Sequence, residues 1–124
     1  MATLGARIAE IQLGLVRISY RADPRFSQQH GHMHAGLATT VADSACGYAA
    51  LSAAPPEAEV LTIEFKANFL RPASGKKFEA IGRVRKAGRN LTFCEGEVWE
   101  TGPERQLIAT MSATMFVWQS RSGG

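Results

Sequence analysis

The sequence is poor in several features, and each shortage excludes a class of protein. It has only two cysteines, Cys46 and Cys94, in no closely spaced motif, so we expect free thiols in a cytoplasmic protein and no disulfide scaffold. No apolar run approaches the roughly 20 residues of a membrane span, and the first residues contain no hydrophobic signal core. The net charge is only +3, and we expect neither a membrane nor a nucleic acid as partner.

The sequence does contain enough apolar material for one ordinary domain. Hydrophobic residues make up 45% and charged residues 20% of the 124 residues, which is the composition of a folded protein. A chain of this length can bury a single core, and no repeat or linker divides it. We therefore expect a single domain over residues 1–124, in which residues 1–11 form a short amphipathic helix or an arm and residues 120–124 form a flexible tail.

The hydrophobic pattern predicts one long helix and about five strands. Residues 13–21 alternate as a strand with one apolar face, and residues 35–53 carry apolar side chains at helical spacing before Pro55 and Pro56 end the helix. In residues 61–69 the apolar side chains take the odd positions, which predicts a single apolar face. Three more strands follow, joined by turns, at residues 77–87, 91–100 and 106–118.

Turns that join neighbouring strands predict an antiparallel sheet, and with one helix packed on it the fold class is α+β. The last strand, residues 106–118, has apolar residues on both faces, among them Met111, Phe116 and Trp118. Because a simple two-layer monomer would leave part of this surface exposed to water, we expect an oligomer.

The segment from His34 to Asp43 is the most informative one for function. A helix that begins at Ala35 presents unpaired backbone N–H groups and the positive end of its dipole, which can polarise a carbonyl or hold an oxyanion. Asp43 follows a little over two turns later, and it is the only acidic residue between Asp23 and Glu57. The pair suggests acyl transfer, with a helix start that activates the electrophile and one carboxylate.

Three segments carry a resemblance to a known family. They are His34-Ala35-Gly36 with Asp43 after it, Asn-Phe-Leu-Arg-Pro-Ala at residues 68–73, and Gly-Arg-Val-Arg-Lys-Ala-Gly-Arg at residues 82–89. With them, the chain resembles the hotdog-fold acyl-CoA thioesterases over residues 12–118, in particular the phenylacetate-degradation subgroup. The resemblance implies an antiparallel sheet of five to six strands wrapped around one long central helix. It also implies hydrolysis of acyl-CoA to the free acid and coenzyme A, with no cofactor.

The family's functional residues match positions of this chain. Asp43 matches the carboxylate that acts as general base or nucleophile, and the backbone N–H of Ala35 or Gly36 matches the group that polarises the thioester carbonyl. Gln28 stands where the family positions the water or the thioester, and Thr62 stands where some members orient the water. The chain departs from the family at Ala35, where the usual residue is glycine; the N–H is kept, and the added methyl narrows the space near the carbonyl.

The resemblance also suggests how substrate and subunits are arranged. Basic residues in regions that often meet the phosphates of coenzyme A are Arg71, Arg83, Arg85, Lys86 and Arg89; a solvated basic surface is the simpler interpretation of the same residues. The family implies a homodimer in which Asp43 and the helix start come from different subunits, and pairing of dimers into a homotetramer. We expect the acyl pocket to include Phe26, Tyr48, Leu51 and Phe69, and the acyl group stays open between aromatic and medium-chain.

Two other sites compete with this interpretation. His30, His32 and His34 alternate, and on a strand three imidazoles on one face could bind zinc. Because the segment contains Gly31 and leads into a helix, we expect no metal, and we expect His34 to make a structural hydrogen bond at the helix start. Cys46 could act as a nucleophile, but no base is adjacent to it, which favours a core cysteine.

Other functions compete as well. Asp43 alone could be a buried acid that is hydrogen-bonded to backbone at a subunit interface. Some hotdog domains bind acyl-CoA without turning it over and act as sensors, and this is the alternative to hydrolysis that we keep. A hotdog dehydratase would normally need a His–Glu or Asp–His pair in the helix region, and no His or Glu follows Asp43 there.

Overall fold

The computed structural model describes residues 5–22, 31–73 and 76–119, with the side chains of the second segment described from residue 35 onward. One helix, α2, spans Gly31–Ser52. The described strands are β1 (Ala6–Gln12), β2 (Leu15–Arg21), β3 (Ala58–Phe69), β4 (Lys77–Ala87), β5 (Leu91–Thr101) and β6 (Arg105–Gln119).

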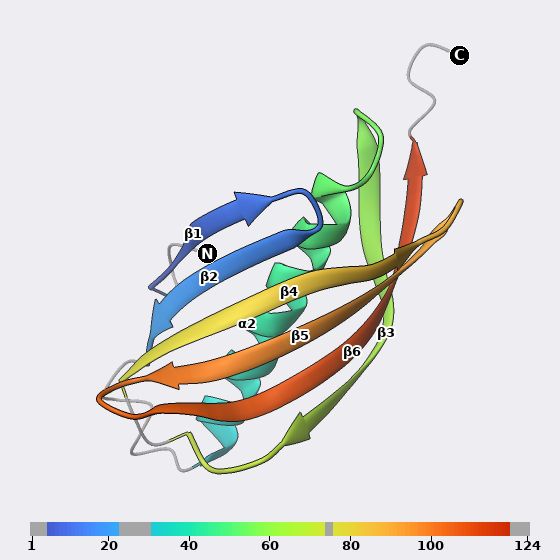
Figure 1. The fold of residues 1–124 in the computed structure, drawn as a ribbon. Helices are drawn as coiled ribbons and strands as arrows, with labels where there is room; N and C mark the ends of the chain where they lie inside the picture. Colours follow the sequence, from blue (N-terminus) through green and yellow to red (C-terminus); the bar gives the residue numbers. More distant parts are fainter. Residues whose placement is uncertain (1–4, 23–30, 74–75, 120–124) are drawn as a thin grey trace.

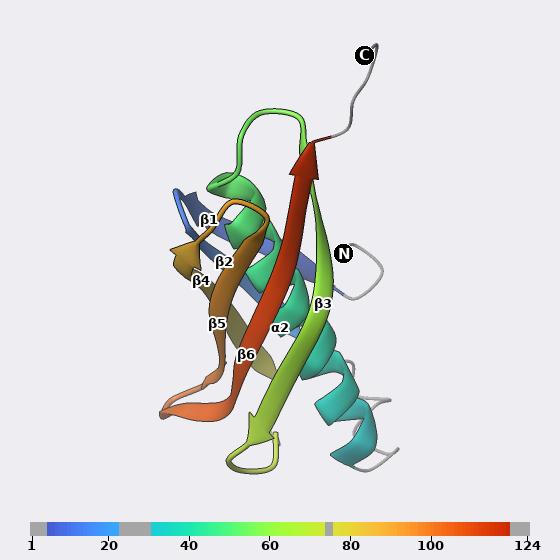
Figure 2. The ribbon, with the colours of Figure 1, turned by 90° about the vertical axis from the view of Figure 1, so that its right-hand side faces the viewer.

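The described strands form one antiparallel sheet in the order β1-β2-β4-β5-β6-β3. The sheet curves strongly around α2, which lies along its concave side (Figure 1). A view from the side shows that β3 and β6 run past the helix on one flank (Figure 2). This arrangement confirms the predicted α+β hotdog fold, with a sheet wrapped around a single central helix.

The core lies between α2 and the concave face of the sheet. The helix contributes mostly small residues, and Val41, Ala45 and Ala49 are fully buried. Small side chains allow the helix to come close to the sheet, and the contact is tightest at Gly82 on β4. A Cβ atom built there would lie 2.4 Å from the carbonyl carbon and oxygen of Ala45. Glycine is therefore required at Gly82 for space.

The expected helix or arm over residues 1–11 is wrong for the described part of that segment. Ala6–Gln12 forms the edge strand β1, which pairs with β2. The two strands meet in a tight turn at Gly14, whose φ of 75° favours glycine. Its N–H donates a 2.8 Å hydrogen bond to Ser52 Oγ, so the turn is tied to the end of α2.

A β-bulge interrupts β3 between Thr62 and Glu64 and changes which residues face the helix. Leu61 lies opposite the exposed Phe116, on the outer face of the sheet, whereas Phe65 lies opposite the buried Ala113. Residues directly opposite each other share a face. The prediction that the odd positions of residues 61–69 share one apolar face is therefore wrong, because Ile63 is the extra residue of the bulge.

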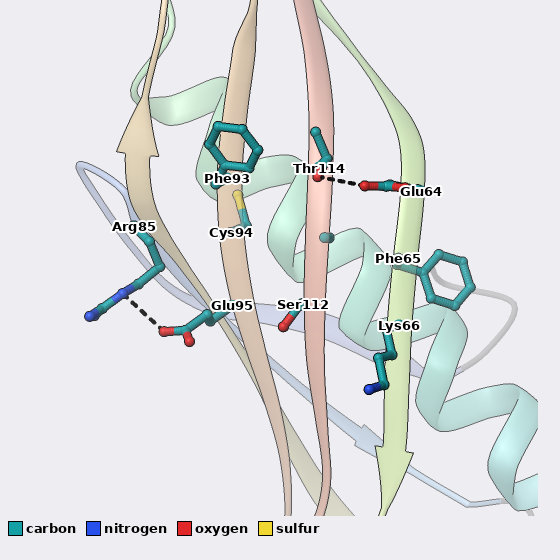
Figure 3. A pocket seen from close by; sticks show the side chains of 10 residues that line it. Glu64, Phe65, Lys66, Arg85, Phe93, Cys94, Glu95, Ser112 and Thr114 are labelled. Atoms are coloured by element: carbon teal, nitrogen blue, oxygen red, sulfur yellow. Dashed lines mark hydrogen bonds and ion pairs between the residues drawn. The ribbon is translucent and has the colours of Figure 1, made fainter.

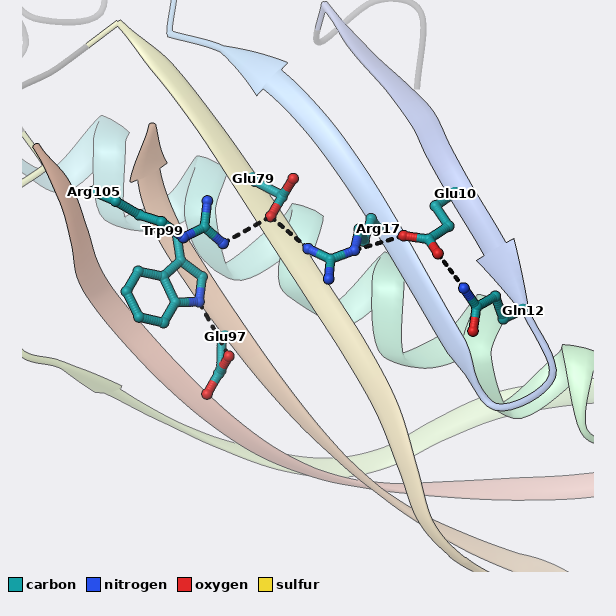
Figure 4. Close-up of polar contacts among 7 residues, drawn as sticks. All are labelled: Glu10, Gln12, Arg17, Glu79, Glu97, Trp99 and Arg105. Atoms are coloured by element: carbon teal, nitrogen blue, oxygen red, sulfur yellow. Dashed lines mark hydrogen bonds and ion pairs between the residues drawn. The ribbon is translucent and has the colours of Figure 1, made fainter. Parts of the chain in front are cut away.

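Paired charges cover part of the outer face of the sheet. Glu79 accepts hydrogen bonds from Arg17 Nη1 at 2.9 Å and from Arg105 Nη2 at 3.0 Å, and Arg17 Nε lies 2.6 Å from Glu10 (Figure 4). The guanidinium of Arg105 also stacks over the ring of Trp99, 4.7 Å from its centroid. This network lies over β1, β2, β4 and the adjacent ends of β5 and β6.

Candidate active site

The structure brings Asp43 of α2 and Thr62 of β3 together. Thr62 Oγ1 donates a 2.8 Å hydrogen bond to Asp43 Oδ1, and it lies 3.2 Å from Met115 Sδ. Asp43 and Thr62 are both partly buried. Because Thr62 precedes the bulge, its side chain points to the concave face, where the helix presents Asp43. Both residues are candidates predicted from the sequence, although they are 19 positions apart in the chain.

Asp43 and Thr62 stand at one end of a groove between α2 and β3. The groove has a volume of about 440 Å³, and it is lined by Asp43, Ser44, Gly47, Tyr48, Leu51, Ala58, Glu59, Val60 and Thr62. The lining includes the apolar side chains of Leu51, Ala58 and Val60. A carboxylate beside a partly apolar groove can activate water, or attack directly, next to a bound acyl group.

Two of the four residues expected to line the acyl pocket lie in this groove. Tyr48 and Leu51 line the groove, Phe69 is exposed further along β3 and does not line it, and Phe26 lies outside the described residues. The sequence does predict Gly47 beside Asp43, on a helix face of small residues that a ligand or another chain can approach, since residues four apart lie on the same helix face. Sequence reasoning missed Val60, whose orientation depends on the position of the bulge.

The expected start of the helix at Ala35 is wrong, because α2 begins at Gly31. Only the first four N–H groups of a helix lack an intrahelical partner, so Ala35 and Gly36 lie beyond the free donors. Their carbonyl oxygens accept hydrogen bonds from Thr39 Oγ1 at 2.8 Å and Thr40 Oγ1 at 2.9 Å. The N–H groups without an intrahelical partner therefore belong to the first turn of α2, one turn earlier than the sequence indicates.

Several expected residues fall outside the description. Gln28 and His30 lie outside the described residues, and the side chains of His32 and His34 are not described either. The backbone of residues 31–34 is helical, so the strand that the zinc alternative requires is absent from these four residues. Among the described side chains, those of residues 5–22, 35–73 and 76–119, no group of three or more His, Cys, Asp or Glu could hold a metal ion.

The basic residues are dispersed and lie away from the Asp43 side chain. Arg83 and Arg85 lie on the outer face of β4, where Arg85 Nε makes a 2.9 Å ion pair with Glu95 (Figure 3). Arg71 follows the end of β3, and Arg89 lies in the turn between β4 and β5. Lys86, directly after a bulge in β4, lies opposite Phe93. Within one chain, these cations do not form one cluster around the groove.

Both cysteines are free and buried. Burial, together with the neighbouring Cys94 and Asp43, raises the pKa of the Cys46 thiol to about 12, and burial raises the pKa of Cys94 to about 11. A thiol needs its thiolate form to act as a nucleophile, so at neutral pH neither cysteine is one. The expectation that Cys46 is a core cysteine agrees with its complete burial.

No helix in the described part of the chain is both long enough and apolar enough to cross a membrane.

Comparisons with known proteins identify the family. A model of the thioesterase superfamily matches residues 30–106. A comparison with curated proteins finds no match.

Solved structures give closer likenesses. A thioesterase family protein from Silicibacter pomeroyi is 47% identical, with a TM-score of 0.91 over 97% of this chain and 89% of that chain. A putative thioesterase from Ralstonia eutropha, related to phenylacetic acid degradation, is 26% identical, with a TM-score of 0.81 over 93% and 86%. The PaaI protein from the phenylacetic acid degradation operon of Escherichia coli is 20% identical, with a TM-score of 0.81 over 93% and 80%, and shows the shared fold.

Proposed function

Since the chain belongs to the thioesterase superfamily, we propose that it is an acyl-CoA thioesterase, which hydrolyses acyl-CoA to a free acid and coenzyme A. The observation that supports this most directly is the hydrogen-bonded pair of Asp43 and Thr62 at one end of a partly apolar groove. The groove suits an acyl group, and the carboxylate suits the attack of water on its carbonyl carbon. The resemblance to the phenylacetate-degradation subgroup supports the same reaction class.

Asp43 acts as general base in the mechanism that we propose. Its carboxylate takes a proton from water while the water oxygen bonds to the carbonyl carbon, the tetrahedral oxyanion forms, and the C–S bond then breaks to release the thiolate of coenzyme A. Each carboxylate oxygen accepts more than one hydrogen bond, so the bond from Thr62 leaves Asp43 able to hold the water. Direct attack by Asp43 is the alternative, and a single turnover in ¹⁸O-water separates the two. General-base catalysis places ¹⁸O in the released acid, whereas direct attack forms an anhydride whose hydrolysis at the Asp43 carbonyl places ¹⁸O in Asp43 and releases an unlabelled acid.

The oxyanion needs a donor that the chain's own helix start does not supply. Gly31 and Asp43 are 12 residues apart, which is about 18 Å along a helix axis, so the free N–H groups of α2 lie far from the carboxylate of the same chain. We propose that the amino end of α2 of a second subunit provides them. The resemblance assigns this role to Ala35 and Gly36; because α2 begins at Gly31, we place it on the N–H groups of the first turn, just before them. Gln28 orients the water, and His34 orients the helix start.

A homodimer through the edge of β3 would bring these parts together. β3 is the last strand in the sheet order, and an open strand edge is normally covered or paired. Ile63, Phe65 and Phe69 on this strand are 53%, 47% and 46% exposed. Pairing two copies along β3 would cover them and would bring each groove close to the other subunit.

Pairing of dimers into a homotetramer would use the outer face of the sheet. Leu61, Phe116 and Leu91 lie opposite one another on β3, β6 and β5, and the Phe116 ring stacks on Trp118. This apolar patch continues at Phe93, which is 43% exposed. We propose that two dimers meet there, beyond the charged network of the same face.

The substrate's phosphates would be held by cations that form no ion pair with another described residue. Arg85 is paired with Glu95, which makes it a weak candidate. The phosphate-binding role that the family resemblance implies stays with the other four cations, Arg71, Arg83, Lys86 and Arg89. Either subunit of a dimer could place them at the mouth of the groove. The buried free thiols support the expectation of a cytoplasmic protein.

The test is release of free thiol from short, medium, long and aromatic acyl-CoAs, by the wild-type protein and by Asp43→Asn. We expect turnover, and a loss of at least about 100-fold in kcat for the variant, which is the usual contribution of a general base. The variant's circular dichroism and oligomeric state serve as the folding control. A folded variant with full activity would remove Asp43 from the mechanism, and binding of acyl-CoA without any turnover would favour the sensor.

A further inference from the structure

Gly47 lies inside α2, more than one turn before its end at Ser52, and glycine is a poor choice there. A glycine inside a helix is less stable than alanine, and such a glycine is usually kept for close packing. Close packing does explain two strand glycines that face α2, Gly82 on β4 and Gly96 on β5, since a Cβ atom there would meet Ala45 or Cys46 at 2.4 and 3.1 Å. At Gly47 a Cβ atom would meet nothing within 4 Å. The chain's own packing therefore gives no reason for glycine at this position.

The empty space above Gly47 continues from the catalytic carboxylate. Asp43, Gly47 and Leu51 follow one another at intervals of four residues, so they lie on one face of α2, and all three line the groove. Val60 and Ala58 of β3 form the opposite wall. Something that enters beside Asp43 and runs toward Leu51 must pass directly over Gly47.

We propose that Gly47 is the specificity-determining residue of the acyl site, a proposal that rests on the thioesterase function. The acyl chain lies along α2 over Gly47, and the side chains of Leu51 and Tyr48 limit its length. Asp43 and Leu51 are eight residues apart, or about 12 Å along the axis, and an extended chain advances about 1.2 Å per bond. The groove therefore fits an unbranched acyl group of about 8 to 10 carbons.

The charge in the groove selects further among acyl groups. Glu59 is an exposed carboxylate that lines the same groove. A second carboxylate at the far end of the acyl chain would be repelled by it. The preferred substrate is thus an uncharged medium-chain acyl thioester, and a dicarboxylic acyl thioester of the same length is disfavoured.

The experiment compares kcat/KM of wild type and Gly47→Ala on acyl-CoAs of 2 to 16 carbons, on an aromatic and on a dicarboxylic acyl-CoA. We expect the wild type to prefer 8 to 10 carbons. The variant should lose about tenfold or more on these, as expected for one misplaced methyl in an apolar pocket, and keep its activity on two to four carbons within about twofold. Gly102→Ala is the matched control, because Gly102 also has open space but lies in the turn after β5.

The thermal midpoint and the oligomeric state of Gly47→Ala complete the test. A midpoint equal to or above that of wild type, with unchanged oligomeric state, supports a space kept for substrate. Three outcomes would overturn the inference and leave thioester hydrolysis in place. They are dissociation of the Gly47→Ala subunits, an equal loss of kcat/KM on all substrates, and a wild-type preference for aromatic or dicarboxylic acyl groups. Absence of hydrolysis by the wild type on every substrate would overturn the proposed function, and this inference with it.

Discussion

Gly82→Ala is expected to destabilise the protein strongly, because it forces the sheet away from the helix. The new Cβ atom would lie 2.4 Å from the carbonyl carbon of Ala45 and 2.6 Å from the nitrogen of Cys46. Carbon atoms pack at about 3.5 to 4.0 Å, so β4 and α2 would have to separate by about 1 Å. Both neighbours are backbone atoms, which cannot rotate out of the way. We expect a loss of about 3 kcal/mol, the upper part of the range for overpacked cores.

The assay is thermal and urea unfolding at one fixed protein concentration, since association changes the apparent stability of an oligomer. A loss of this size lowers the thermal midpoint by about 10 °C in a chain of this length. Gly47→Ala is the control with the opposite sign: the same methyl in open space on the same helix should add up to about 1 kcal/mol. A Gly82→Ala protein that unfolds within about 2 °C of wild type would refute the close approach of β4 and α2.

Three further predictions concern the site and the cysteines. Thr62→Val should lower kcat/KM about 10- to 100-fold, the value of a hydrogen bond to a charged group, and should have no further effect in an Asp43→Asn background; independent losses would show that Thr62 does not act through Asp43. Arg89→Ala should raise KM for acyl-CoA more than for a phosphate-free thioester, and equal effects would remove its phosphate role. Burial raises the pKa of Cys94 from 9.0 to about 11, so the unfolded chain loses its proton first and stability falls as pH rises from 9 toward 11. Urea unfolding over this range should show a smaller fall for Cys94→Ala, and an unchanged profile would contradict the prediction.

The sequence predicted the long elements because their patterns are long. The helix was recognisable from apolar residues at helical spacing and from the prolines that follow it, and β2, β4, β5 and β6 from alternation between turns. β1 was missed because it is an edge strand: of Ala6–Gln12 only Ala6 is buried, so the segment has no consistent apolar face. The start of α2 at Gly31 was missed because residues 31–34 carry neither a capping residue nor an apolar stripe to mark it.

The parts of the candidate site that depend on residue type could be predicted from the sequence. The parts that depend on how the strands pair could not. Asp43 was conspicuous as a lone acid in an apolar helix. The ion pair between Arg85 and Glu95 depends on how β4 pairs with β5 and on the bulge between Val84 and Lys86. No local sequence pattern predicts that register. The sequence therefore suggests one positive surface from Arg83, Arg85, Lys86 and Arg89, although Arg85 is already paired with Glu95.

The bulge in β3 is where the most regular pattern of the sequence fails, and it is also where the site is built. With strict alternation, Thr62 and Phe65 would lie on opposite faces of the sheet. The extra residue Ile63 allows both to face the helix side, opposite Met115 and Ala113. Thr62 can then donate its hydroxyl hydrogen bond to Asp43, and the apolar side chain of Phe65 can face the same side of the sheet further along β3. Bulges are common beside active sites because they redirect single side chains, and here the redirection separates the hydrogen-bonding part of β3 from its apolar part.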